Sequence, residues 1–208
     1  MSLFRVGPRV FLAVLLLLAP SPAVADSRVI VALGDSLTAG LGVAADEAYP
    51  ALLEARLRAA GFDSRVVNAG VSGDTSAGGV RRLDWVLRAR PDVAIVALGA
   101  NDGLRGLPVT ALRDNLTMIV RRLRDAGAQV LLVGMRLPPN YGEAYAGAFA
   151  DTFRSVAQRT AVAFLPFLLE GVAAQPRFNQ PDGLHPNAAG QRVIADHVWT
   201  ALQPLLRR

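Results

Sequence analysis

Short apolar runs alternate with longer amphipathic stretches along this chain, and this alternation limits its possible folds more than any other feature. Five runs of four to seven residues favour strands, at residues 28–33, 64–68, 92–98, 129–134 and 162–165. Five longer segments carry apolar residues at helical spacing, at residues 48–60, 75–90, 110–126, 144–160 and 187–205. The pattern predicts strands and helices in strict alternation.

Strands that are apolar throughout are buried on both faces, which is typical of a parallel sheet covered by helices. Right-handed crossovers between such strands give a doubly wound sheet. We therefore predict an α/β fold with three α/β/α layers and a five-stranded parallel sheet. No repeat or linker interrupts the pattern, so residues 26–208 should form one domain.

The first 25 residues have the features of a secretory signal peptide. Arg5 and Arg9 precede an apolar run at residues 10–19, and a small-residue ending leads to Ala25. The run is shorter than the roughly 20 residues that span a bilayer. We expect cleavage after Ala25 and a periplasmic or secreted protein with no stable membrane anchor; an uncleaved anchor helix is the alternative.

Composition excludes several classes of function. The chain has no cysteine, which rules out disulfides, thiol catalysis and thiolate metal sites. All 22 basic residues are arginine, and they are scattered at spacings that fit solvated helix faces. Because a nucleic-acid site would need a concentrated basic stripe, we expect no nucleic-acid partner.

Polar, glycine-rich segments follow the ends of the predicted strands. Ligands of a doubly wound sheet bind beyond the carboxyl ends of its strands, so these segments should meet at one site. They are residues 34–37, 70–74, 99–102 and 137–141. A fifth polar segment, residues 182–186, precedes the last predicted helix and is expected at the same edge.

Ser36, His185 and Asp182 are the candidates for nucleophilic chemistry. A serine nucleophile needs a base within hydrogen-bond reach, and that base needs an orienting acid. Ser36 follows a buried strand, and Asp182 precedes His185 by three residues in a loop. Taken singly, Ser36 fits a helix cap or turn and the Asp-x-x-His pattern fits a structural loop. His197, the other histidine, lies within a predicted helix and is expected to be structural.

Acyl transfer also needs donors for the developing oxyanion. Gly73 and Ser36 can each offer a backbone N–H, and Asn101 can offer its side-chain amide. Gly73 and Asn101 also fit ordinary turn positions. Asp35 and Asp102 are expected to be structural, accepting loop N–H bonds that hold Ser36 and Asn101. A G-x-S-x-G elbow is absent around Ser36, so the common α/β-hydrolase pattern is not supported.

These segments together resemble the sequence blocks of the GDSL/SGNH hydrolases. Gly34-Asp35-Ser36-Leu37 is similar to the first block, and Gly73, Asn101 and residues 182–185 are similar to the other three, in the family's order. Residues 68–76, 101–106, 136–142 and 165–167 further resemble the bacterial periplasmic multifunctional thioesterase, arylesterase and lysophospholipase group. Ala100 departs from a glycine that this group often has.

The resemblance implies a flavodoxin-like SGNH hydrolase fold, a Ser36–His185–Asp182 triad and an oxyanion hole from Ser36, Gly73 and Asn101. The expected substrates are small acyl esters and thioesters, with no metal or organic cofactor and a monomeric enzyme. The flanking apolar residues should contact the acyl or aryl group; these are Leu104, Leu107, Leu137, Pro138 and Tyr141. A carbohydrate acetylesterase of the same fold and a non-catalytic binding protein are the alternatives.

Overall fold

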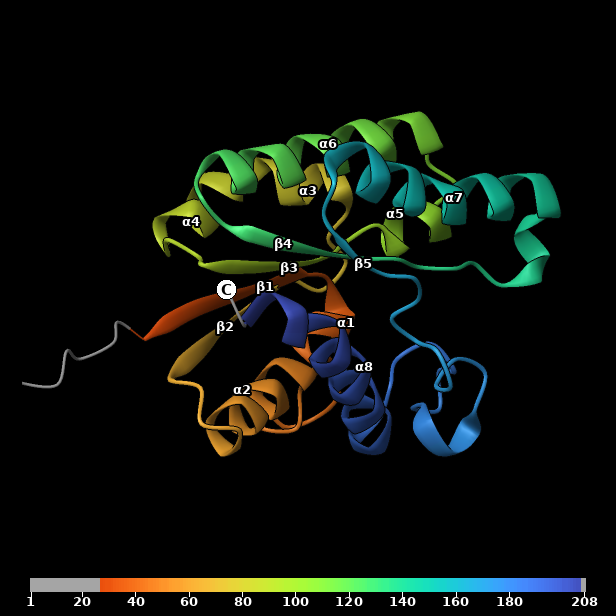
Figure 1. Ribbon diagram of the computed structural model, residues 1–208. Coiled ribbons are helices and arrows are strands. Elements are labelled where there is room, and N and C mark those ends of the chain that lie inside the picture. Colours follow the sequence, from red (N-terminus) through yellow and green to blue (C-terminus); the bar gives the residue numbers. More distant parts are fainter. Residues whose placement is uncertain (1–26, 207–208) are drawn as a thin grey trace, which may run out of the picture.

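The computed structural model describes residues 27–206, and its centre is a five-stranded parallel sheet (Figure 1). The strands are β1 (Arg28–Gly34), β2 (Ser64–Gly70), β3 (Val93–Ala97), β4 (Gln129–Val133) and β5 (Ala163–Leu165). Their spatial order is β2-β1-β3-β4-β5. The predicted parallel sheet is confirmed, whereas the predicted signal peptide lies outside the described residues.

Helices cover both faces of the sheet, which confirms the three-layer, doubly wound prediction. Figure 1 shows α2 (Tyr49–Ala59) and α8 (Ala188–Leu206) together on one face. The opposite face carries α3, α4, α6 and α7, at Ser76–Arg81, Leu83–Arg88, Val109–Asp125 and Glu143–Thr160. Apart from one divided helix and the additional short helices, the order of strands and helices along the chain is the one that the apolar pattern predicts.

The core lies against the interior strands β1, β3 and β4. Every residue of β3 is buried, and residues 30–33 of β1 have no exposed surface. Helix α6 packs an apolar stripe onto this layer through Leu112, Leu116, Ile119, Val120 and Leu123. Burying these side chains supplies most of the stability of such a layer, at roughly 25 cal/mol per Å² of apolar surface.

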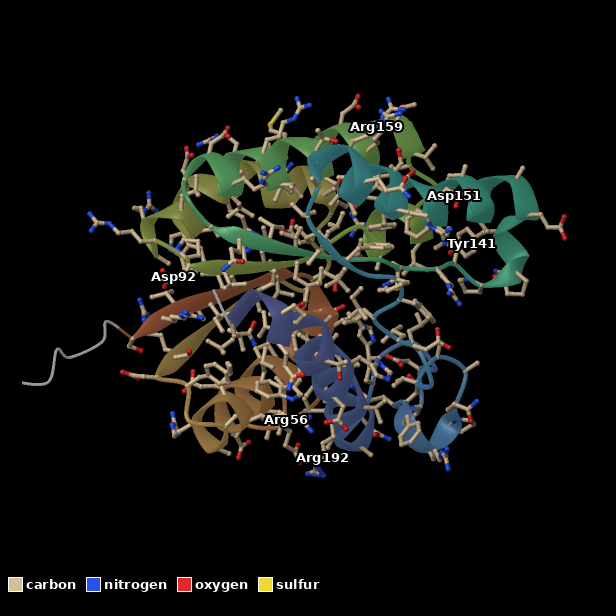
Figure 2. The ribbon with its side chains drawn as sticks, viewed as in Figure 1. Arg56, Asp92, Tyr141, Asp151, Arg159 and Arg192 are labelled. Atoms are coloured by element: carbon tan, nitrogen blue, oxygen red, sulfur yellow. The ribbon has the colours of Figure 1, made fainter. Side chains whose placement is uncertain are left out.

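The arginines lie mainly on outer helix faces, as the sequence predicts. Arg56 on α2, Arg159 on α7 and Arg192 on α8 are exposed at the periphery (Figure 2). Within residues 27–206, no helix is both long and apolar enough to cross a membrane.

One expected helix is divided in the structure. Residues 75–90 form two helices, α3 and α4, which meet at Arg82. The side chain of Arg82 turns inward from this junction and binds the ends of β1 and β2. Two short helices were also not expected: α1 (Ser36–Ala39) follows β1, and α5 (Ala100–Leu104) follows β3.

The topology places a crevice beside β1. The chain moves from β1 to β2 on one side and returns to β3 on the other, so the strand order reverses at β1. Loops that leave β1 and β3 separate at such a point and leave space for a ligand. Ser36 and Asn101 lie on these two loops, each in one of the short helices.

Candidate active site

The nucleophile candidate, Ser36, is the first residue of helix α1. Asp35 caps this helix, because its Oδ1 accepts the backbone N–H of Leu37 at 3.0 Å. The carbonyl of Leu37 in turn accepts the side-chain amide of Gln191 on α8 at 3.3 Å. These bonds fix the short turn that carries Ser36 at the end of β1.

The structure brings Ser36, His185 and Asp182 into one chain of contacts. Ser36 Oγ lies 3.0 Å from His185 Nε2, and His185 Nδ1 lies 2.6 Å from Asp182 Oδ2. Both distances are within hydrogen-bond range, so the imidazole can hold the Nδ1–H tautomer and accept a proton at Nε2. This is the order of groups that activates a serine hydroxyl.

Local bonds hold the Asp182–His185 turn in shape. Asp182 Oδ1 accepts the backbone N–H groups of Leu184 and His185 at 2.9 and 3.0 Å. Gln180 anchors the turn to the loop after α1, because its side-chain amide donates to the carbonyl of Leu41 at 2.6 Å. This bond joins the two loops of the site in addition to the contact between Ser36 and His185.

The two acidic residues of the site have opposite pKa shifts. Hydrogen bonds from the backbone and side chain of His185 and from the backbone of Leu184 lower the pKa of Asp182 to about 2. Asp182 is therefore a carboxylate whenever the protein is near neutral pH. Burial raises the pKa of Asp35 from 3.8 to about 6, against the lowering effects of its bond from Leu37 and the charge of His185.

Gly73 lies in a tight turn after β2. Its φ angle is +78°, in the left-handed region where glycine is favoured, and the N–H of Asp74 closes the turn on the carbonyl of Val71 at 3.0 Å. The carbonyl of Gly73 accepts a bond from Arg105 at 2.8 Å. Arg105 immediately follows α5, so the turn is tied to the segment that contains Asn101.

Asn101 reaches the same turn directly. Its Nδ2 donates to the backbone carbonyl of Asp74 at 3.0 Å, and the residue also lines the cavity beside Ser36 and His185. An amide nitrogen carries two hydrogens, so one can hold Asp74 while the other serves an oxyanion. The structure thus brings Asn101 and the Gly73 turn together.

Both aspartates expected to be structural accept backbone N–H bonds. Asp35 bonds the turn that carries Ser36. Asp102, in the same short helix as Asn101, accepts the backbone N–H and the hydroxyl of Ser76 at 2.7 and 2.5 Å, which joins α5 to α3. The hydroxyl of Ser76 also accepts a bond from Asn115 on α6 at 3.0 Å. This network fixes the position of α5 relative to α3 and α6.

A cavity of about 690 Å³ opens beside Ser36 and His185. Three of the five predicted substrate-binding residues line it, namely Leu104, Leu137 and Pro138. Leu107 and Tyr141 are not among its lining residues. The hydroxyl of Tyr141 donates to the carbonyl of Leu104 at 3.1 Å, so Tyr141 supports the end of α5.

Sequence reasoning missed several other apolar residues that line this cavity. Among them are Met135, Phe167, Leu169, Ala173, Ala174 and Leu184. Met135 lies just beyond the carboxyl end of β4, where residues of the site are expected in this kind of sheet. The segment between β5 and the Asp182–His185 turn has no periodic pattern, so its side chains could not be assigned from sequence.

The described residues hold two histidines, with distinct positions. His185 faces the cavity, whereas His197 lies in α8 and is not among the residues that line the cavity. Within residues 27–206, no group of three or more histidine, aspartate or glutamate side chains is placed to hold a metal ion.

Comparison with known proteins identifies the family. The model of the GDSL-like lipase/acylhydrolase family matches residues 32–193. The chain belongs to this family. The shared region contains Ser36, Gly73, Asn101, Asp182 and His185.

Relatives of this GDSL-family chain span nearly its whole length. Esterase TesA of Pseudomonas aeruginosa is 44% identical over 183 residues, which cover 88% of this chain and 91% of TesA. Thioesterase 1/protease 1/lysophospholipase L1 of Escherichia coli K12 is 42% identical over 193 residues, covering 92% and 90%. The crystal structure of psychrotrophic esterase EstA from Pseudoalteromonas, inhibited by monoethylphosphonate, has a TM-score of 0.82 and 35% identity, covering 87% and 100%.

Proposed function

We propose that this chain is a serine hydrolase that cleaves carboxylic esters and thioesters through an acyl-enzyme. The contact chain Ser36–His185–Asp182 beside an apolar cavity carries the proposal. The names of the relatives, esterase and thioesterase/lysophospholipase, support the same bond class. The phosphonate-inhibited structural neighbour supports an activated serine in this fold.

The proposed reaction begins when Ser36 Oγ attacks the substrate carbonyl and His185 Nε2 takes the hydroxyl proton. Asp182 stabilises the resulting imidazolium and keeps its ring oriented. The backbone N–H groups of Ser36 and Gly73 and the amide of Asn101 stabilise the tetrahedral oxyanion.

The intermediate then collapses. The bond to the leaving alcohol or thiol breaks, and His185 gives that group its proton, which leaves Ser36 acylated. A water molecule repeats the sequence: His185 takes its proton, the hydroxide attacks the acyl carbon, and Ser36 regains a proton as the fatty acid leaves.

We further propose that the cavity holds the acyl or aryl part of the substrate. Its apolar lining includes Leu104, Leu137, Pro138, Phe167 and Leu169. A chain of several carbons is stabilised there by roughly 0.8 kcal/mol per buried CH₂. Tyr141 acts through its bond to Leu104, and Leu107 can contact only a substrate part that extends beyond the cavity.

A panel of p-nitrophenyl esters from two to sixteen carbons, with a long-chain acyl-CoA and a lysophospholipid, tests this function. We expect turnover of the esters and thioester, and covalent labelling by a fluorophosphonate that Ser36→Ala abolishes. A preference for acetylated sugars over acyl esters would favour the carbohydrate acetylesterase. Absence of both labelling and turnover would favour the non-catalytic binding protein.

We propose that the protein works outside the cytoplasm, in the periplasm or as a secreted enzyme, after a signal peptide of residues 1–25 is removed. N-terminal sequencing of exported protein should begin at Asp26. Size-exclusion chromatography should give a monomer, and the protein should be found in the soluble exported fraction. An intact N-terminus in the membrane fraction would support the uncleaved anchor helix.

A further inference from the structure

We propose that Arg82 is a positioning residue that sets the geometry of the oxyanion hole; this inference rests on the proposed hydrolase function. Its side chain is 19% exposed and makes three hydrogen bonds. Nε donates to Asp74 Oδ2 at 2.7 Å, Nη1 to the carbonyl of Ala69 at 2.7 Å, and Nη2 to the carbonyl of Gly34 at 2.8 Å.

The three partners belong to the segments that carry the proposed oxyanion donors. Gly34 is the last residue of β1, two residues before Ser36. Ala69 is the last residue but one of β2, and Asp74 directly follows Gly73. A single guanidinium therefore joins the segment before Ser36 to the turn that contains Gly73.

Asp74 extends this link to the third donor. Arg82 holds its carboxylate, and Asn101 Nδ2 binds its backbone carbonyl at 3.0 Å. Asp74 is thus held from both ends, and its position determines how Gly73 and Asn101 lie relative to each other. A shift of Asp74 would change two donors at once.

Arginine is required here because of the shape of its side chain. A guanidinium is planar and presents five N–H donors in fixed directions, so it can bind a carboxylate and two carbonyls together. A lysine has one compact ammonium and cannot reach three partners in these positions. The carboxylate of Asp74 is only 10% exposed, so losing its partner leaves a largely buried charge uncompensated.

The helix boundary at Arg82 is consistent with this role. The apolar pattern predicts one helix over residues 75–90, but the backbone leaves helical geometry at Arg82, with φ −103° and ψ 8°. The break lies at the one residue of this region whose side chain binds both β1 and β2. The predicted helix is therefore interrupted at the residue whose side chain connects the segments of the site.

The test compares Arg82→Lys with the wild type on p-nitrophenyl butyrate. The substitution should displace the oxyanion donors that Arg82 positions, and these donors act on the transition state. We therefore expect kcat to fall about 10- to 100-fold while KM changes less than about threefold. Arg122→Lys is the matched control, since Arg122 pairs with Asp84 on the surface, with side chains 50% and 78% exposed. It should keep the wild-type kcat.

A double-mutant cycle with Asn101→Ala separates positioning from general destabilisation. If Arg82 acts through the oxyanion hole, Arg82→Lys should lower kcat by a smaller factor in the Asn101→Ala background than in the wild type, because one of the donors that it positions is already absent. Fully multiplicative losses, or an unchanged kcat in Arg82→Lys, would overturn the proposal.

Should Arg82→Lys fail to fold, Asp74→Ala removes the carboxylate that Arg82 binds, and the same signature is expected. Unchanged kcat in folded Asp74→Ala would also overturn the proposal. Wild-type enzyme that turns over no ester would refute the hydrolase function itself, so the two failures are distinguishable.

Discussion

Ser36 Oγ lies 3.0 Å from His185 Nε2, although 149 residues separate the two along the chain. The contact forms because both residues lie on loops at the carboxyl edge of the sheet. Gln180 and Gln191 stabilise it from outside the triad, by binding the carbonyls of Leu41 and Leu37. The geometry of the proposed triad therefore depends on how α8 and the loop that precedes it pack against α1 and the loop that follows α1.

Replacing the nucleophile is expected to abolish turnover without unfolding the protein. Ser36→Ala removes the Oγ that attacks the carbonyl but leaves the Asp35 cap on Leu37 in place. Losses of about 10⁴-fold or more in kcat are typical for a triad serine. Ester turnover, fluorophosphonate labelling and a thermal melt of the variant measure the effect. Near-normal turnover in the folded variant would refute the mechanism.

Asn101→Ala should affect kcat far more than KM. In the proposed mechanism the amide stabilises charge that is present only in the transition state, and loss of one such donor costs about 10²- to 10³-fold in kcat. The variant also removes the bond to the carbonyl of Asp74, so the upper part of this range is expected. Steady-state kinetics on one ester suffice. A rise in KM with normal kcat would show that Asn101 only binds substrate.

The fold was predictable because its strands and long helices carry strong patterns. Burial of β3 on both faces and the α6 stripe follow directly from apolar spacing. Helices α1 and α5 were not predictable, since four or five residues hold too little periodicity to detect. The break at Arg82 depends on bonds to Gly34 and Ala69, which are distant in sequence.

The candidate site was likewise predictable only in part. The strand-end argument and the family resemblance locate Ser36, Asn101 and His185, because position in the topology is enough to bring them together. Substrate contacts depend on side-chain direction, which only tertiary packing decides. Tyr141 turns to the carbonyl of Leu104, and Phe167 lines the cavity from a loop with no periodic signal.

Asp35→Asn should stabilise the protein at alkaline pH. The pKa of Asp35 is raised to about 6 by burial, and its Oδ2 has no hydrogen-bond partner among residues 27–206. Unfolding lets the carboxyl ionise near its usual 3.8, so the folded state loses stability as pH rises from about 4 through about 6. Asparagine removes the charge and can still accept the Leu37 N–H.

Urea denaturation at pH 4 and pH 8 measures this effect. At pH 4 Asp35 is protonated in the folded state, so the variant should differ little from the wild type. At pH 8 the variant should be more stable, by about 1–3 kcal/mol for a shift of this size. Equal destabilisation at both pH values would mean that the charge of Asp35 is compensated in the folded protein.

Leu137→Ala should weaken the dependence of activity on acyl chain length. Leu137 lines the cavity beside the triad, and each CH₂ it helps to bury contributes roughly 0.8 kcal/mol at best. In the wild type, kcat/KM should therefore rise by about one to two orders of magnitude between acetyl and octanoyl esters. The variant should lose most of that increase and keep its activity on acetyl esters, because the shortest chain makes little contact with Leu137.

Leu107→Ala is the matched comparison: this leucine is 37% exposed and lies outside the cavity lining, so the chain-length dependence should persist. Acetyl esters that outperform octanoyl esters in the wild type would contradict an acyl cavity and favour the carbohydrate acetylesterase instead.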